Sequence, residues 1–306
     1  MSRKFLKWLG YGLLGIILLA VIVIAVMIIL SEPMPEHPFF ENFAEDDFVI
    51  LAHQGGDGEF PSNTLFAFQS ATDLGVDVLE LDIHSSADDV LVVIHDDTVD
   101  RTTNGSGRVN DMTLAELQAL DAGYNFPTLA DHPLLNTGEF PYRGEGLQIP
   151  SLEEIFIAFP EMPISIEIKQ ESPSIAQPLC DLIREYERET LTIVPSFSPL
   201  AMDEFREACP EVATAGVAPE ITTFFALNFV GLGSAWQPIT ESFMIPEYQG
   251  DLHVITQGFV NQAHQHNVVI YPWTINTEEQ MLRMMDLGVD GIITDYPSLA
   301  LALSRR

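Results

Sequence analysis

The sequence predicts an α/β protein, a (β/α)8 TIM barrel preceded by one N-terminal transmembrane helix. Eight short apolar segments alternate with amphipathic segments over residues 48–306, a pattern typical of a parallel sheet covered by helices. A long uncharged stretch precedes them, and polar residues recur where several apolar segments end. The predicted domains are a cytoplasmic N-terminus (1–7), a transmembrane helix (8–30), an acidic linker (31–47) and the barrel (48–306).

The N-terminus has the composition of a membrane anchor. Residues 8–30 are 23 uncharged residues, and about 20 are enough to cross a bilayer as a helix. A cleaved signal peptide has an apolar core of only about 7–15 residues followed by small residues, but this stretch ends in Ile, Ile and Leu. We therefore expect an uncleaved, single-pass anchor.

Charge around this stretch predicts its orientation. Arg3, Lys4 and Lys7 precede it, whereas six acids and no base follow within residues 31–47. Basic residues stay in the cytoplasm, so the N-terminus is expected inside and the barrel outside. Residues 31–306 hold all 45 acids and 10 of the 13 bases, a net charge of −35. Such acidity excludes nucleic acid as a partner, because phosphates would be repelled.

The barrel elements are predicted in chain order. Apolar segments expected as strands are 48–54, 78–84, 163–169, 191–197, 212–217, 241–245, 268–275 and 291–295. Helical patterns between them include 64–75, 151–159, 173–189, 198–209 and 277–288. An extra strand at 90–96 should form a hairpin with its predecessor, which leaves 97–150 as a long insertion after the second strand. Long loops in compact domains tend to be functional.

The two cysteines, Cys180 and Cys209, fit no zinc-binding spacing. Their spacing is compatible with one disulfide and equally with two buried free thiols.

Chemistry in such a barrel lies where the strands end. Glu80 and Asp82 share one face of their strand because side chains alternate, and Glu167 and Lys169 share a face in the same way. Three converging carboxylates predict a site for one divalent cation with hard oxygen ligands, Ca²⁺ or Mg²⁺. Lys169 adds a positive charge that suits an anionic group.

Histidines also stand at these strand ends, namely His53, His84 and His95. Two histidines beside a metal can act as general base and general acid. Each residue alone has an ordinary structural interpretation: Lys169 pairing with Glu167, Trp273 as core, Asp295 as a loop cap, and His84 as a packed barrel residue.

The segments that carry these residues resemble the glycerophosphodiester phosphodiesterase family. The resemblance covers about residues 49–300 and includes "AHQGG", "PSNTLFAF", "LELDIHSSADDVLVVIHDDTVDRTTNGSGRV", "SIEIK" and "WTINTEEQMLRMMDLGVDGIITDYPSLA". It implies a TIM barrel that hydrolyses glycerophosphodiesters to sn-glycerol 3-phosphate and an alcohol. It also implies acid/base roles for His53 and His95, metal binding by Glu80, Asp82 and Glu167, and substrate contacts from Lys169, Gln54 and Trp273.

Two positions depart from the family pattern. His-Arg-Gly and Pro-Glu-Asn-Thr are common there, whereas this chain has Gln54 and Ser62 in place of the arginine and the glutamate. Losing both together is coherent, because a buried charge without its partner is costly. Gln54 can still donate a hydrogen bond to a phosphate, more weakly than arginine. Arg101 is expected to brace the loop that follows His95.

Two other functions remain open on the sequence. One is lysophospholipase D activity, with a lysolipid as the phosphodiester substrate; the predicted membrane helix puts such lipids within reach. The other is a non-catalytic, membrane-tethered binding domain, which the intact histidines and carboxylates disfavour.

Overall fold

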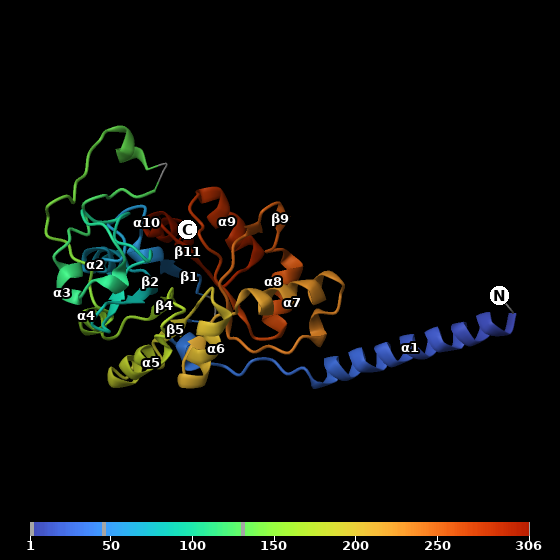
Figure 1. The fold of residues 1–306 in the computed structure, drawn as a ribbon. Helices are drawn as coiled ribbons and strands as arrows, with labels where there is room; N and C mark the ends of the chain where they lie inside the picture. The colour runs from blue at the N-terminus through green and yellow to red at the C-terminus, as the bar shows by residue number, and fades with distance from the viewer. Residues whose placement is uncertain (1–2, 45–46, 130–131, 306) are drawn as a thin grey trace.

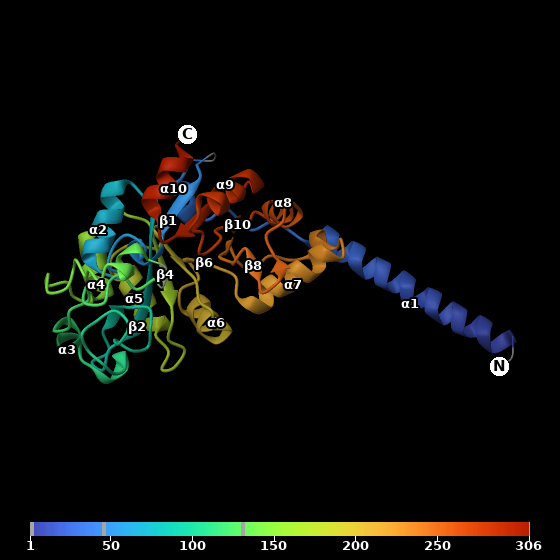
Figure 2. The same ribbon diagram turned by 90° about the horizontal axis from the view of Figure 1, so that it is seen from above.

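The computed structural model describes residues 3–44, 47–129 and 132–305. A parallel barrel forms the body of the protein, as Figures 1 and 2 show. Around it the strands run β1 (Val49–Ala52), β2 (Val78–Ser85), β4 (Ile164–Ile168), β5 (Thr192–Val194), β6 (Ala213–Thr214), β7 (Ser242–Phe243), β10 (Val269–Ile270) and β11 (Gly291–Thr294), which pairs again with β1. The TIM-barrel prediction is confirmed.

Backbone contacts close the barrel where the continuous sheet stops. Ala215 bridges Ser242 between the ends of β6 and β7, and β7 pairs with β10. The Ile293 N–H then donates to the Pro272 carbonyl and joins β11 to the chain after β10. Strands β5 and β10 are shorter than predicted because Pro195 and Pro272 follow them. Proline has no N–H to donate to the ladder.

Helices cover the outside of the barrel (Figure 2). They are α2 (Leu65–Leu74), α4 (Leu152–Ala158), α5 (Ala176–Glu185), α6 (Pro199–Ala208), α7 (Ala218–Phe229), α8 (Gln257–Gln265), α9 (Glu278–Leu287) and α10 (Pro297–Ser304). Several begin at a Ser or Thr whose side-chain oxygen accepts a backbone N–H of the first turn: Thr64, Ser151, Ser198, Thr256 and Thr277. Such caps fix where each helix starts.

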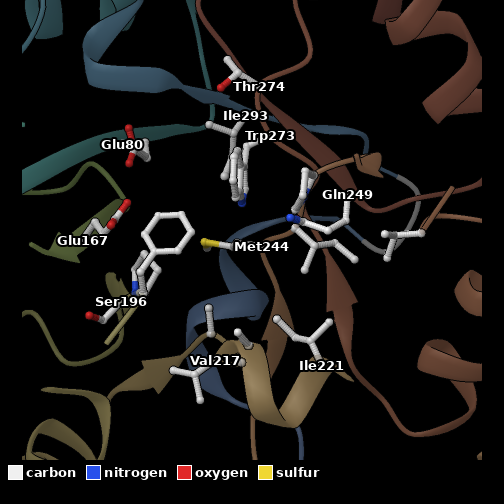
Figure 3. A pocket seen from close by; sticks show the side chains of 18 of the residues that line it. Glu80, Glu167, Ser196, Val217, Ile221, Met244, Gln249, Trp273, Thr274 and Ile293 are labelled. Atoms are coloured by element: carbon white, nitrogen blue, oxygen red, sulfur yellow. The ribbon is translucent and has the colours of Figure 1, made fainter. Parts of the chain in front are cut away.

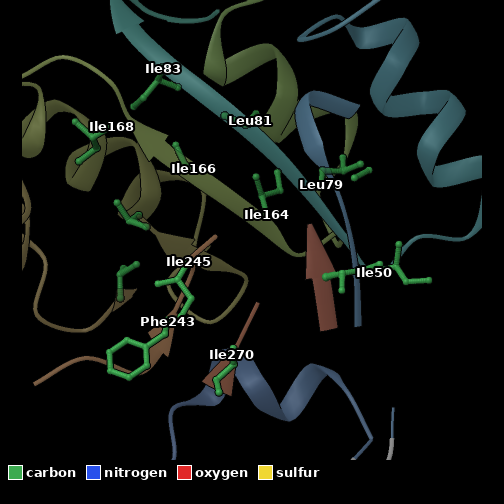
Figure 4. Packing of buried hydrophobic residues seen from close by; sticks show 14 of the residues in the cluster. Ile50, Leu79, Leu81, Ile83, Ile164, Ile166, Ile168, Phe243, Ile245 and Ile270 are labelled. Atoms are coloured by element: carbon green, nitrogen blue, oxygen red, sulfur yellow. The ribbon is translucent and has the colours of Figure 1, made fainter. Parts of the chain in front are cut away.

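Strand alternation divides apolar from chemical side chains. Leu79, Leu81 and Ile83 of β2 belong to the main core, which includes residues of the covering helices, and Figure 4 shows them beside the isoleucines of β4. The intervening residues of β2, Glu80 and Asp82, project to the opposite face. The polar pair is therefore held by a strand that is fixed through its other face.

The chain between β2 and β4 forms the expected insertion. Strand β3 (Leu91–Val93) pairs antiparallel with β2, and η3 (Val109–Asp111), α3 (Leu114–Gln118) and η4 (Pro133–Asn136) follow. A separate apolar cluster supports this insertion: Val92, Ile94, Val99, Val109, Leu117, Ala122 and Ile149. The insertion is therefore a packed unit over most of its length.

The N-terminal helix α1 (Arg3–Leu30) projects away from the barrel in both views (Figures 1 and 2). Its Tyr11–Leu30 segment is long and apolar enough to cross a membrane, a test that a signal sequence near the N-terminus also passes. After it, the Ser31 hydroxyl donates to the Trp236 carbonyl at 2.5 Å. The end of α1 is thus attached to the segment that follows α7.

Two links complete the body of the protein. Phe39 of η1 (Pro38–Asn42) is fully buried and packs with inward-facing barrel residues such as Val49 and Leu51. The predicted linker thus supplies a residue to the barrel core. Cys180 of α5 and Cys209 after α6 form a disulfide, which resolves the alternative that the sequence left open.

Candidate active site

Three carboxylates meet where β2 and β4 lie side by side. Asp82 is paired in register with Glu167, and Glu80 lies two residues before Asp82 on the same strand. All three are buried, and each offers an oxygen within 4.8 Å of the others. Hard oxygen donors at this spacing fit a divalent cation such as Ca²⁺ or Mg²⁺. The geometry therefore places together the three residues expected to bind metal.

Neighbouring groups hold these carboxylates in place. Lys169 Nζ lies 3.2 Å from Asp82 Oδ1 and 2.9 Å from Glu167 Oε1. The Asn63 amide donates to Asp82 Oδ2 at 3.0 Å, and the Gln54 backbone N–H donates to Glu80 Oε2 at 2.9 Å. Lys169 can balance one of the three carboxylates, and a bound cation would neutralise the negative charge that remains when all three are ionised.

Burial and mutual repulsion shift the pKa values of these three acids. Burial and repulsion from Asp82 raise the pKa of Glu80 to about 8, and burial also raises the pKa of Glu167. Burial opposes ionisation of Asp82, but the positive charge of Lys169 outweighs it together with smaller contributions from His95, His53 and the Asn63 hydrogen bond, so the Asp82 pKa is lowered. A bound divalent cation would favour the ionised form of all three.

His53 directly follows β1, and a carboxylate that directly follows the neighbouring strand β11 contacts its ring. Its Nδ1 lies 2.5 Å from Asp295 Oδ1, and the Asn276 amide donates to Asp295 Oδ2 at 2.6 Å. Burial lowers the pKa of His53, but attraction to Glu80 and the Asp295 hydrogen bond prevail and raise it to about 10. Asp295, a strand-end residue for which the sequence also allowed a role as a loop cap, holds the His53 ring through this contact.

His95 follows β3 and has its own carboxylate. Its Nδ1 lies 2.7 Å from Asp96 Oδ1, and Arg101 Nε donates to Asp96 Oδ2 at 2.8 Å. The hydrogen bond from His95, then that from Arg101, lowers the pKa of Asp96 against the effect of burial. Arg101 thus braces the start of the loop, as expected, and is linked to His95 through Asp96.

A cavity of about 700 Å³ opens over these groups, and Figure 3 shows its lining. Charged groups at one end are His53, Glu80, His95, Glu167 and Lys169. The remaining wall is mostly apolar and includes Phe197, Val217, Ile221, Phe225, Met244, Leu252 and Trp273. The Trp273 ring packs edge-on against Phe197 with centroids 5.5 Å apart. The cavity can therefore hold a charged phosphate beside an apolar group.

Two other residues considered from the sequence lie outside this lining. The Gln54 side chain is buried, with its amide nitrogen 3.3 Å from His53 Nε2. His84 Nε2 lies 3.1 Å from the His95 carbonyl, and burial lowers the His84 pKa. His84 contributes to a smaller cavity of about 210 Å³ together with Arg108 and Lys169.

Comparison with known proteins identifies the family. The model of the glycerophosphoryl diester phosphodiesterase family matches residues 53–299. A glycerophosphodiester phosphodiesterase of Caldanaerobacter subterraneus subsp. tengcongensis is 35% identical over 266 residues, which cover 84% of this chain and 98% of that protein. Lysophospholipase D GDPD1 of Rattus norvegicus is 30% identical over 276 residues, 81% of this chain and 83% of that protein.

A solved structure agrees. The crystal structure of a glycerophosphodiester phosphodiesterase from Agrobacterium tumefaciens matches with a TM-score of 0.67 and 25% identity, covering 84% of this chain and all of that one. Fold, family model and relatives therefore lead to the same conclusion. The chain is a phosphodiester hydrolase and belongs to the glycerophosphoryl diester phosphodiesterase family.

Proposed function

We propose that the chain hydrolyses glycerophosphodiesters to sn-glycerol 3-phosphate and an alcohol by acid–base catalysis from His53 and His95. The observation that carries this proposal is the pair of histidines, each held by its own carboxylate, beside one buried cluster of three acids. Two oriented imidazoles at a phosphate-sized charged site suit a reaction that needs one proton removed and one supplied.

One imidazole takes a proton from the attacking group, either water or the 2-hydroxyl of the substrate glycerol. Attack by water gives sn-glycerol 3-phosphate directly, whereas attack by the 2-hydroxyl first gives a cyclic phosphate that water then opens to the same product. The new P–O bond forms as the bond to the alcohol breaks, and the other imidazole protonates the departing oxygen. Lys169 faces the cavity and offers positive charge to the phosphate. Glu80, Asp82 and Glu167 would hold one cation, Ca²⁺ or Mg²⁺, which supplies further positive charge to the phosphate oxygens.

The apolar wall supports a second substrate, a lysophospholipid. The cavity beyond the charged end is lined by apolar residues, namely Val217, Ile221, Phe225 and Leu252. A small polar head group would gain no apolar contact from this surface, whereas an acyl chain would be buried against it. A relative of 30% identity is a lysophospholipase D. In both reactions the phosphate stays on the glycerol, so the same catalytic groups serve.

We propose that α1 anchors the enzyme with the barrel outside the cytoplasm. The apolar Tyr11–Leu30 segment and the charge difference across it support this topology. The Cys180–Cys209 disulfide supports it independently, because disulfides persist in oxidising compartments. Protease added to intact cells, or to spheroplasts, should cleave the barrel; protection there would reverse the orientation.

The activity is tested with a panel of glycerophosphodiesters and lysophospholipids assayed with Ca²⁺, with Mg²⁺ or with chelator. We expect turnover that chelation abolishes and added metal restores, with phosphate retained on the glycerol fragment. Glu80→Gln removes one negative charge from the ligand cluster without changing its size. It should therefore weaken metal binding and raise the metal concentration that turnover needs. Chelator-insensitive turnover would refute the metal site, and substrate binding without any turnover would support the non-catalytic alternative.

A further inference from the structure

A stripe of apolar side chains runs along α7 from the cavity to the end of that helix. Ile221 and Phe225 line the cavity, and Phe229 follows at the same four-residue spacing. Residues four apart lie on one face of a helix. The rings of Phe225 and Phe229 stack with centroids 6.4 Å apart and an interplanar angle of 19°. The stripe is therefore continuous from the cavity wall to the protein surface.

The outer end of the stripe is unusually exposed. Phe229 is 81% exposed, Val230 63% and Ile239 55%. Residues 221–240 contain no charged side chain, although the chain holds 45 acids. Exposed apolar groups without charge are typical of a surface that contacts a membrane or another protein.

The position of α1 favours a membrane as the occupant of this surface. Ser31, directly after the candidate span, donates to the Trp236 carbonyl, and Glu32 and Gln237 exchange two hydrogen bonds at 3.3 Å. Figures 1 and 2 both show the end of α1 beside the chain that follows α7. If α1 crosses a bilayer, residues 229–239 lie at its surface.

We propose that α7 contacts the outer surface of the bilayer through Phe229, Val230 and Ile239 and guides a single-chain lipid from the bilayer into the cavity. This inference rests on the proposed function and specifies its substrate source. The acyl chain lies along Ile221 and Phe225, and the phosphate reaches His53 and His95. Apolar contact along the whole path avoids exposing the chain to water.

The direct test places a polarity-sensitive fluorophore on the full-length protein in phosphatidylcholine vesicles. Both native cysteines are in the disulfide, so Phe229→Cys provides one thiol for labelling. The matched control is Ile157→Cys, since Ile157 is 62% exposed on α4, on the side of the barrel away from α1. We expect the fluorophore at 229 to emit at shorter wavelength and to be quenched by brominated lipid. The fluorophore at 157 should show the emission of a label in water. An aqueous label at 229 overturns the proposal.

A second test measures lysophosphatidylcholine in the vesicles and water-soluble glycerophosphocholine in parallel. Phe229→Ser with Val230→Ser should reduce the ratio of lipid to soluble turnover about tenfold, whereas Ile157→Ser should leave that ratio unchanged. An unchanged ratio in the double variant refutes the lipid path. Failure of the unmodified protein on both substrates would instead count against the proposed function, and the label at 229 still decides the membrane contact.

Discussion

His53 and His95 face the same cavity, but the chain supports them by different means. His53 follows β1, its partner Asp295 lies 242 residues away at the end of β11, and Asn276 follows β10. Only closure of the barrel brings these three side chains together. The geometry around His53 therefore depends on the whole fold.

The arrangement around His95 is local. Asp96 is the next residue, and Arg101 follows five positions later. The His95 side chain is 37% exposed, against 22% for His53. Changes in the insertion should therefore affect the position of His95 while the barrel keeps His53 in place. Substitutions around each histidine should accordingly have different effects on kcat.

The largest effects are expected from the histidines themselves. His53→Ala and His95→Ala should each reduce kcat by about 10²–10⁴, the usual range for a lost acid or base. Circular dichroism and metal affinity should change little, and His84→Ala serves as the matched control. If His84→Ala were as damaging as His95→Ala, the assignment of the catalytic pair would be wrong.

The partner carboxylates should distinguish the two arrangements. Asp295→Asn should lower kcat by about 10–100-fold, taking as a guide the cost of losing a hydrogen-bond partner that orients a metal-binding side chain. Asp96→Asn should cost less, because water can reach the more exposed His95 and replace the lost hydrogen bond. KM should be nearly unchanged in both. Equal losses in kcat would contradict the contrast between a buried and an exposed arrangement.

Arg101 should have a smaller effect that acts only through Asp96. Arg101→Gln removes a partly exposed ion pair, and such pairs contribute about 0–1 kcal/mol, so kcat should fall by at most about fivefold. The control is Arg108→Gln, which breaks the more exposed pair with Asp97. We expect Arg101→Gln to have no further effect in Asp96→Asn; an additive loss would show that Arg101 acts elsewhere.

Local patterns in the sequence predict much of the site. Alternation along β2 places Glu80 and Asp82 on one face, and the apolar strands predict that Glu167 reaches the same end. The Asp295–His53 contact is harder to predict, because it depends on which strands meet when the barrel closes. Phe39 is a similar case: an aromatic residue in an acidic segment gives no local sign that it enters the barrel.

A modest pH effect on stability should appear around His95. The pKa of Asp96 lies below its ordinary value of 3.8 because of His95 and Arg101, so its ionised form stabilises the fold above about pH 4 and this stability is lost as pH falls through the lowered pKa. Asp96→Asn should therefore reduce Tm at pH 7 by a few degrees, and by less at pH 3. Calorimetry at both values checks this, and a difference that grows in acid would contradict it.

The smallest effect is expected beside His53, at the two positions that depart from the family pattern. The Asn63 N–H donates to the Gln54 carbonyl at 2.9 Å, so Gln54 and the segment containing Ser62 are adjacent, and both side chains are buried.

Gln54→Arg alone places an unpaired charge there and should bring little gain in kcat/KM and some loss of Tm. Adding Ser62→Glu supplies the missing partner, so the double variant should be better tolerated. Lys169→Ala is the reference, because with Gln54 neutral Lys169 provides the permanent positive charge in the cavity lining, and turnover should collapse as it does for the histidine variants. A double-mutant cycle on kcat/KM and Tm measures the coupling between positions 54 and 62, which is expected at about 0.5–3 kcal/mol for neighbouring residues. Strictly additive effects would show that the two positions do not interact, and the paired departure would then have no electrostatic cause.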